Sequence, residues 1–573
     1  MEAFSIQEAY AGRHILIAGG SGFLGKVWLA MALEKLDDLG KVYVLLRRSS
    51  HGSALSRFES LINSSYVFKS LHEKFGSHLT FRLSERVEVL EGDITAENLG
   101  LPAATVERLR KDLDLFINCV GLVDFNPDIR DALSTNVEGA LNAARFTSGL
   151  SKAALLHVST CYVAGSREGR IPETIETRFS PNGAVFDPEQ EYRDLKKTIG
   201  RITREQYTAQ VETELRSLVA KRAGKRRRAG DVAEKMLRAL RRRQLRETMV
   251  TEGVKRAQKL GWPNIYTYTK ALGEALLTQR YGHLRLSVLR PSIVESALKY
   301  PIPGWNEGFN TSGPLAYLLG SWFRFFPAKI GNPFDVIPVD LVGIGMTLAG
   351  AALLTRRNRR VYQCATSDSN LFTIDRACEL TSLGHRIHLR KHGSTKLKRA
   401  VLSRWDSVTV GDHYLFSIRK LGTVTRQLER LLSKIPSSGV PALEKPLEKA
   451  RGALDRTNRK LAQVDEMLRL FMPYIHDYHQ IYECASLREM EVLEPEFRFD
   501  TGAVKWRDYW LNIHMPGLRR WCFRAIEGKD RERLKPEHPV KLRREDVSQP
   551  KTAEAPPPEA HQIRDRPREV SDR

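Results

Sequence analysis

Short runs of apolar residues alternate with longer helical patterns along the first half of the chain. The apolar runs lie at 14–18, 41–48, 86–94, 113–121, 154–163 and 284–294, and helical patterns lie between them, for example at 23–36, 127–148 and 264–281. Strands that alternate with helices in this way form a parallel sheet with helices on both faces. The pattern therefore predicts an α/β fold built on a doubly wound parallel sheet.

Other parts of the chain depart from this alternation. The stretch at about 190–258 has helix-forming composition and apolar residues three and four apart (Leu215, Leu218, Val219), which predicts a helical insertion. Beyond about 360, the segments 416–435 and 443–475 predict a helical hairpin with its turn in "PSSGVP". Charge and proline dominate from 527 on, a composition typical of disorder. We expect a sheet domain at 1–360, a mainly helical C-terminal domain at 361–526 and a disordered charged tail at 527–573.

The net charge of +23 is distributed unevenly. Residues 216–246 hold thirteen Lys and Arg, including "KRRR" at 225–228 and "RRR" at 241–243. Such a patch attracts phosphates, nucleic acid, anionic lipid or an acidic protein, although a merely solvated helix has the same composition. The insertion is therefore expected to be basic, and its partner stays open at this point.

The cysteines and the apolar stretches indicate a cellular setting. The six cysteines are scattered with no C-x-x-C pair, which argues against a disulfide framework and a zinc site and fits a reducing cytoplasm. The first residues contain no apolar leader, and no run reaches the roughly 18 apolar residues of a spanning helix. We expect a cytoplasmic protein without a signal peptide or transmembrane segment, able to rest on a membrane surface.

A glycine-rich turn joins the first predicted strand to its helix. In "AGGSGFLG" at 18–25, Gly19 permits a tight turn, Gly22 lets the backbone approach a pyrophosphate, and Gly25 allows close packing of helix and strand. The free N–H groups at the start of the helix then attract the phosphates. The turn predicts a Rossmann dinucleotide site that comprises Gly19, Gly20, Ser21, Gly22, Phe23, Leu24 and Gly25.

The ends of the next strands indicate which dinucleotide binds. Arg47 and Arg48 end the second strand, where an acid would bind the ribose of NAD, and arginine instead attracts a 2′-phosphate. NADPH is therefore predicted over NADH. Asp93 and Ile94 in "EGDI" fall near the expected adenine, and Val120 in "NCVG" falls where small residues could pass under the cofactor.

A candidate catalytic pair lies in "WPNIYTYTKALGE" at 262–274. Residues four apart share one face of a helix, so Tyr266 lies with Lys270, whereas Tyr268, two residues from the lysine, faces another side. Ser159 and Thr160 in "HVSTCYV" end the fifth strand, where a hydroxyl could share a substrate oxygen with Tyr266. A turn cap is the plainer role for such a hydroxyl. The glycine turn, the hydroxyl pair and the Tyr-x-x-x-Lys spacing are more informative together than singly.

These motifs resemble the extended short-chain dehydrogenase/reductase superfamily. "GGSGFLGKVWL", "WPNIYTYTKALGE", "LRPSIVESALKYPIPGWNEG" and "DVIPVDLV", which span 19–341, are similar to the alcohol-forming fatty acyl-CoA reductases. "FDTGAVKWRDYWLNIHMPGLRRW" at 499–521 resembles the end of that family's C-terminal "sterile" domain. Two features differ: the basic insertion is longer than expected, and the membrane-spanning C-terminal segment of animal members is missing.

The resemblance implies roles for these residues. Tyr266 would be the general acid, and Lys270 would bind the nicotinamide ribose and lower the tyrosine pKa from about 10. Thr160, with Ser159 as the fallback, would polarise the carbonyl, and Asn136 would be a support. Hydride from NADPH would convert the thioester to aldehyde and CoA, and a second hydride would give the alcohol, without a metal or a cysteine nucleophile. Cys119 and Cys161 are accordingly interpreted as small buried residues.

Several alternatives and partners follow from this interpretation. A reductase that stops at the aldehyde would use the same residues, and a sugar-nucleotide or steroid-type member or a non-catalytic NADP- or nucleic-acid-binding protein is a further alternative. The fatty-acyl signatures and the intact Tyr266–Lys270 pair favour the reductase, and no zinc finger or RNP-like motif supports specific nucleic-acid binding.

The apolar segments at 313–354 and the C-terminal helices are expected to form an acyl tunnel. The basic insertion is expected to dock CoA phosphates, an acyl carrier protein or an anionic membrane; chain length and oligomeric state stay open.

Overall fold

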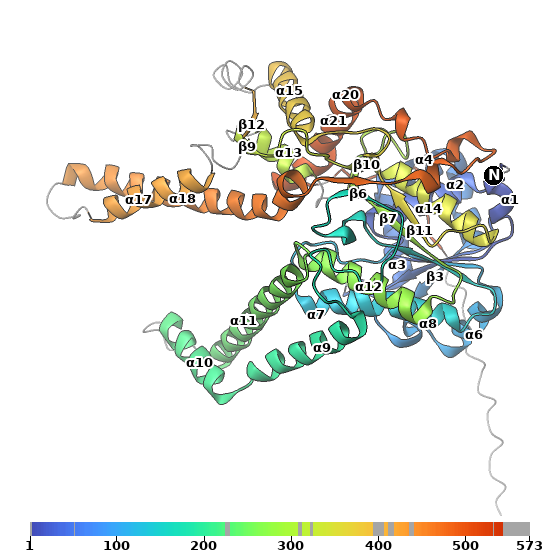
Figure 1. Cartoon of the computed structure of the whole chain (residues 1–573), viewed down its shortest axis with the longest axis horizontal. Helices are drawn as coiled ribbons and strands as arrows, with labels where there is room; N and C mark the ends of the chain where they lie inside the picture. The colour runs from blue at the N-terminus through green and yellow to red at the C-terminus, as the bar shows by residue number, and fades with distance from the viewer. Residues whose placement is uncertain are drawn as a thin grey trace, which may run out of the picture.

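The computed structural model of the chain has a parallel sheet at its centre (Figure 1). It describes residues 3–50, 52–223, 230–307, 312–320, 325–392, 406–410, 418–434, 441–530 and 532–542. The seven strands run in the order β11-β7-β5-β4-β1-β2-β3. Their bounds are β1 Ile15–Ala18, β2 Val42–Leu46, β3 Val87–Glu91, β4 Leu115–Asn118, β5 Ala154–Val158, β7 Leu286–Pro291 and β11 Val361–Cys364. This order confirms the predicted doubly wound α/β fold, because β1 pairs in parallel with both β2 and β4.

Alternate residues of each strand face different helical layers. Ile15 and Ile17 of β1 join the core that contains α2 and α14, whereas Leu16 and Ala18 join the core on the opposite face, beside α8. The helices of the Rossmann part are α1 Ile6–Tyr10, α2 Phe23–Lys35, α3 Ala54–Ser64, α4 Lys69–Phe75, α5 Leu79–Arg86, α6 Ala103–Asp112, α7 Ile129–Ala132, α8 Gly139–Ser148, α12 Ile265–Tyr281, α13 Gly313–Leu319 and α14 Val339–Leu354. Burial of the sheet on both faces explains why strands such as β1 and β2 are continuous apolar runs, whereas the edge strand β3 is only partly buried.

The basic insertion is helical, as predicted. It consists of α9 Pro188–Glu205, α10 Ala209–Ala223 and α11 Gly230–Lys259, which extend from the body of the molecule (Figure 1). Leu215, Val219 and Leu237 form a small core between α10 and α11. Near the base of the insertion, an ion pair of 2.6 Å between Arg256 of α11 and Glu191 of α9 joins these two helices. The "KRRR" run at 225–228 lies outside the described residues.

The C-terminal region is mainly helical and contains the predicted hairpin. Its helices are α15 Ile374–His392, α17 Ile418–Lys434, α18 Pro441–Met472, α19 Ala485–Arg488, α20 Trp506–Asp508, α21 Met515–Leu518 and α22 Arg524–Ile526. α17 and α18 pack side by side, and the predicted turn at 436–440 lies outside the described residues. Short parallel strand pairs also join distant segments: β6 Gly169–Ile171 with β13 Gln480–Tyr482, β8 Ile293–Glu295 with β10 Val336–Pro338, and β9 Phe325–Pro327 with β12 Val408–Val410.

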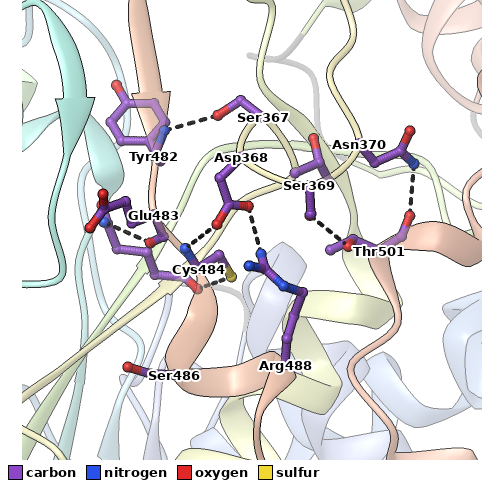
Figure 2. Close-up of polar contacts among 12 residues, drawn as sticks. Ser367, Asp368, Ser369, Asn370, Tyr482, Glu483, Cys484, Ser486, Arg488 and Thr501 are labelled. Atoms are coloured by element: carbon purple, nitrogen blue, oxygen red, sulfur yellow. Dashed lines mark hydrogen bonds and ion pairs between the residues drawn. The ribbon is translucent and has the colours of Figure 1, made fainter.

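Hydrogen bonds fasten the C-terminal region to the edge of the sheet. Figure 2 shows the loop after β11 beside the segment around 482–501, where Asp368 pairs with Arg488 at 2.6 Å and accepts a bond from the Cys484 amide at 2.9 Å. Ser367 accepts a bond from the Tyr482 amide at 2.9 Å. The sequence patterns did not predict β11, at 361–364, as a strand. Because β11 belongs to the sheet, the sheet extends just past the predicted domain boundary at 360. The sheet and the C-terminal region therefore share an extensive polar interface.

The prediction of a disordered tail from 527 on is wrong for residues 532–542. Val540 is 1% exposed, and its backbone exchanges two hydrogen bonds of 2.8 and 2.9 Å with the Asn63 side chain on α3. Glu532 pairs with Arg520 and accepts a hydrogen bond from Tyr66. Composition suggested disorder, but one buried valine and a set of backbone partners hold this stretch against α3. Residues 543–573 lie outside the described part of the chain.

Among the described residues, none of the helices combines the length and the apolarity required to cross a bilayer.

Candidate active site

The glycine turn has the geometry of a phosphate cradle. Gly19 adopts φ +88°, and a Cβ there would lie 2.6 Å from the Cys119 carbonyl oxygen. A Cβ on Gly25 would collide with the Gly19 carbonyl oxygen, so the helix can approach the turn only because Gly25 has no side chain. Gly22 caps α2 without a side-chain hydrogen bond, which leaves the amides at the start of the helix available. The turn therefore fits a dinucleotide pyrophosphate.

The other turn residues divide between core and surface. Gly20 is buried, and a Cβ there would lie 3.3 Å from Val44. Ser21 is exposed, whereas Phe23 and Leu24 line the cavity described below. Gly20 thus belongs to the packing of the turn rather than to its open side.

Three arginines, rather than the two predicted, surround the end of β2. An open hollow of about 660 Å³ is lined by Arg47, Arg48 and Arg57 together with Glu91 and Asp93. Arg57, on α3, donates a hydrogen bond to the Arg47 carbonyl oxygen. Arg48 pairs with Glu91 at 2.8 Å, and Arg47 lies 3.9 Å from Asp93. Local sequence gave no signal for Arg57, because only the packing of α3 brings it to this hollow.

Two other predicted contacts fall elsewhere. Ile94 is buried, 3.3 Å from the Cβ position of Gly139, and therefore packs under α8. The Val120 carbonyl oxygen lies 3.5 Å from the Lys270 ammonium nitrogen, beneath the cavity.

A cavity of about 410 Å³ brings together Tyr266, Lys270, Thr160 and Ser159. The first two come from the N-terminal half of α12, and the hydroxyl pair follows the end of β5. Asn264 caps α12 by accepting a hydrogen bond of 3.0 Å from the Thr267 amide, which fixes where the helix begins. The hydroxyl pair and the Tyr266–Lys270 pair, which lie about a hundred residues apart in sequence, therefore meet in one cavity beside the glycine turn.

The structure separates the two tyrosines of the motif. Tyr266 is partly exposed and lines the cavity. Tyr268 is fully buried on another side of α12, and its hydroxyl donates a hydrogen bond of 2.5 Å to the Glu191 carboxylate of the insertion. Tyr268 therefore has a packing role, in agreement with the helical spacing.

The Lys270 ammonium faces main-chain oxygens inside the protein. Its Nζ donates a hydrogen bond of 3.0 Å to the Val158 carbonyl oxygen. The residue is 3% exposed, and burial lowers its pKa from 10.5 to about 8, against smaller raising effects of Cys119 and Glu274. A substantial fraction of Lys270 is consequently neutral at mildly alkaline pH.

The expected lowering of the Tyr266 pKa is not observed. Burial raises this pKa to about 12, and the largest opposing effect is a hydrogen bond from the Thr160 side chain. The Lys270 ammonium donates to the Val158 carbonyl oxygen, and no effect of its charge offsets the desolvation of the phenol. Tyr266 is therefore a protonated phenol across the neutral range, a state suited to donating a hydrogen bond or a proton.

The hydroxyl pair at the end of β5 differs in its bonding. The Thr160 hydroxyl lies 3.4 Å from the Pro291 carbonyl oxygen and caps the next turn by accepting from the Tyr162 amide at 3.3 Å. The buried Ser159 hydroxyl has no hydrogen-bond partner among the described residues and borders the cavity. Such an orphaned polar atom at a cavity wall is expected to find a partner in a ligand.

Asn136 supports the floor of the cavity. Its side chain accepts a hydrogen bond from the Leu122 amide at 2.8 Å and donates one to the Thr269 hydroxyl at 3.0 Å, which links the loop after β4 to α12.

The two cysteines near the site are both poorly ionised. Cys119 borders the cavity, whereas Cys161 is buried and its thiol donates a hydrogen bond to the Arg290 carbonyl oxygen. Burial raises the pKa of both thiols. High pKa values leave both sulfurs as poor nucleophiles.

Aromatic residues of the C-terminal region form one wall of the cavity. Phe471, in the last turn of α18, meets the Phe125 ring edge-on at a centroid distance of 5.3 Å. Tyr474, just after α18, stacks on Phe125 at 5.6 Å. The Tyr474 hydroxyl accepts a hydrogen bond of 2.7 Å from the Asn264 cap of α12. Leu315 and Phe334 also line the cavity, so part of the 313–354 region faces it. Phe471 and Tyr474 lie some two hundred residues from Tyr266 and could not be assigned to this site from sequence.

A buried polar chain reaches the cavity at Ser312. The Ser312 hydroxyl lies 3.4 Å from His514 Nε2, and His514 Nδ1 lies 3.0 Å from the Ser296 hydroxyl. Burial lowers the His514 pKa to about 3, so this imidazole is neutral at physiological pH. The chain provides a second connection between the C-terminal region and the cavity wall.

The fold and this site define a nicotinamide-dependent oxidoreductase of the extended short-chain dehydrogenase/reductase superfamily. Residues 17–344 match the NAD-binding family described as Male sterility protein. The match covers more than half of the chain, and the chain belongs to this family.

Known proteins agree with this assignment. The chain is 28% identical over 532 residues to Fatty acyl-CoA reductase 8 of Arabidopsis thaliana, with 90% of this chain and 98% of that protein covered. It is 27% identical over 543 residues to the Alcohol-forming fatty acyl-CoA reductase of Simmondsia chinensis, with the same two coverages. Among solved structures, the reductase domain of a non-ribosomal peptide synthetase from Mycobacterium tuberculosis aligns with a TM-score of 0.47 and 16% identity, over 92% of this chain and 94% of that one. The family match over residues 17–344 and the two relatives confirm the resemblance inferred from the motifs.

Proposed function

We propose that the protein reduces long-chain fatty acyl-CoA to the fatty alcohol with NADPH, through an aldehyde and with release of CoA. The observation that carries the proposal is the single cavity that joins Tyr266, Lys270 and the Ser159–Thr160 pair to an apolar aromatic wall. Its catalytic end suits a carbonyl, and its wall suits an alkyl chain. The relatives named fatty acyl-CoA reductases support the same substrate class.

NADPH, rather than NADH, is the proposed cofactor. The glycine turn would hold its pyrophosphate, and Arg47, Arg48 and Arg57 would bind the 2′-phosphate. Three arginines against Glu91 and Asp93 leave a net positive hollow, which favours a phosphate over a free hydroxyl. A bound reduced nicotinamide supplies the hydride.

Each catalytic side chain has a proposed task. The hydroxyls of Tyr266 and Thr160 stabilise negative charge on the substrate oxygen by hydrogen bonds, with Ser159 as a further donor. Tyr266 then gives its proton to the oxygen that becomes the alcohol. Lys270 binds the ribose beside the nicotinamide and keeps the tyrosine oriented.

The electron balance requires two hydrides for each alcohol. The first reduces the thioester to aldehyde as the carbon–sulfur bond breaks and CoA leaves, and the second reduces the aldehyde. The alternative is a reductase that stops at the aldehyde with one hydride. Another carbonyl substrate of an extended short-chain reductase is the second alternative.

The basic insertion is proposed to dock the anionic end of the acyl donor. The described part of α10 and α11 is rich in Lys and Arg. α10 lies at the outer end of the insertion, and α11 runs from there back to the body beside α12 (Figure 1). CoA phosphates or an acidic acyl carrier protein would fit this charge, with an anionic membrane surface as the alternative. If docking is electrostatic, the Michaelis constant for acyl-CoA rises with salt.

One assay tests the reaction. Purified protein is incubated with palmitoyl-CoA and NADPH, and NADPH consumed is compared with CoA released. Two NADPH per CoA support the alcohol, one supports the aldehyde, and none rejects the proposal. Tyr266→Phe should abolish turnover, while Tyr268→Phe serves as the matched control because that phenol points toward Glu191 and away from the cavity.

A further inference from the structure

The helical hairpin of α17 and α18 carries an apolar stripe that nothing in the described structure covers. Val424, Leu428 and Leu431 on α17 are 51%, 46% and 61% exposed. They are spaced four and three residues apart, which places all three along one side of the helix. Gly422 and Thr425 are less exposed, and the side that carries them packs against α18. The stripe is therefore additional to the contact that holds the hairpin together.

The hairpin is also strongly basic. Residues 418–472 contain twelve Lys and Arg and six Asp and Glu, a net charge of +6. In α18, Asp455 and Asp465 are already paired with Arg459 and Arg469, four residues away. α17 alone has five basic residues and one acidic residue, and its Arg426 is exposed. A helix with an apolar stripe on one side and basic residues on its polar side is typical of helices that lie in a membrane interface.

We propose that α17 docks on an anionic lipid surface with Val424, Leu428 and Leu431 facing the acyl layer. The charge favours this occupant over a second copy of the chain, since two hairpins of charge +6 repel each other. α17 is amphipathic and only 17 residues long, so it lies on the surface and does not span the bilayer.

The hairpin connects this surface to the active-site cavity. α18 has 32 residues, which corresponds to about 48 Å of helix. Its outer part packs on α17, and its final turn places Phe471 in the cavity wall. In Figure 1 the hairpin extends well away from the body. Lipid docking would therefore hold the cavity at the end of a rigid arm close to the membrane, where long acyl chains partition.

Vesicle binding tests the proposal without relying on the reductase activity. The full chain is sedimented with phosphatidylcholine vesicles that contain or lack phosphatidylglycerol, at low and high salt. Leu428→Glu combined with Leu431→Glu should weaken binding to the anionic vesicles by at least about tenfold, because each leucine loses its transfer into the apolar layer and adds a repelled charge. Val185→Glu is the matched control, since Val185 is 98% exposed but lies before α9, in another part of the molecule.

The outcomes separate the proposal from its competitors. Binding of the wild type and of Val185→Glu, with loss in the double variant at an unchanged thermal midpoint, supports it. The proposal is overturned if the wild type ignores anionic vesicles, or if the double variant binds as the wild type does, which would assign lipid binding to the basic insertion. A dimer in light scattering that the double variant dissociates would also overturn it, since a second copy would then cover the stripe.

Discussion

Lys270 gives a prediction that can be tested without substrate. The ammonium is 3% exposed and its pKa is lowered to about 8, so the folded protein holds a charge that would be more stable in water. Lys270→Met removes that charge and keeps a similar unbranched shape. We expect the variant to be inactive as a reductase but more stable than the wild type at neutral pH, as found where active sites are built at the expense of stability.

The magnitude and its pH dependence follow from the shift. A pKa that falls from 10.5 to about 8 corresponds to about 3 kcal/mol of unfolding free energy. Between these two pH values the unfolded lysine binds a proton that the folded lysine has released, so the stability of the wild type rises with pH. The stability that comes from keeping Lys270 neutral in the folded state is fully present above pH 10.5 and is lost as pH falls through about 8. The advantage of Lys270→Met should therefore be largest at and below pH 8 and should shrink by about 3 kcal/mol by pH 10.5.

The measurement compares thermal and urea unfolding of both proteins between pH 7 and 10.5, without cofactor. Loss of the hydrogen bond from Nζ to the Val158 carbonyl oxygen offsets part of the gain at every pH, so the change of the difference with pH is the informative quantity. Lys259→Met, which removes an exposed ammonium from α11, should follow the wild type at every pH. Parallel curves for Lys270→Met and wild type would refute the argument that burial of this charge costs stability.

Three further predictions concern catalysis, cofactor choice and folding. The apparent kcat/KM should fall as pH rises through about 8, where Lys270 loses its proton, while Tyr266 should not contribute below about 12; a pH–rate profile checks both limbs. Arg57→Ala should weaken NADPH binding about tenfold and leave NADH binding nearly unchanged, as measured by titration of nucleotide fluorescence, and equal losses for the two nucleotides would contradict a 2′-phosphate contact. Val540→Asp should destabilise the protein by about 3 kcal/mol in thermal and urea unfolding, because it places a carboxylate at a position that is 1% exposed. Lys541→Asp, at the exposed neighbouring position, is the control, and a midpoint of Val540→Asp equal to that of the wild type would contradict the ordered packing of 532–542.

The sequence alone predicted the features that depend on neighbouring residues in the chain, namely strands, the glycine turn and helix spacing. The buried strands are continuous apolar runs, and the glycine turn is required by the φ of Gly19 and the close approach of Gly25 to it. The choice of Tyr266 over Tyr268 needed only the spacing of a helix. Features formed by tertiary contacts were missed: Arg57 reaches the hollow through the packing of α3, and Val540 is held by the Asn63 side chain far away in sequence. The sign of the Tyr266 pKa was also missed, because it depends on burial and not on the neighbouring lysine.

The cavity is a joint product of the sheet and the C-terminal region. The sheet and α12 position the proposed catalytic groups: Thr160 follows β5, and Lys270 on α12 reaches the main-chain oxygens of Val120 and Val158. The C-terminal region closes the opposite side, since Tyr474 accepts a hydrogen bond from Asn264, the residue that caps the start of α12. That single bond of 2.7 Å couples the wall that would contact an acyl chain to the helix that carries the phenol. A change in the wall therefore alters the position of Tyr266 as well as the shape of the cavity, and substrate preference and turnover are expected to vary together in variants of Tyr474.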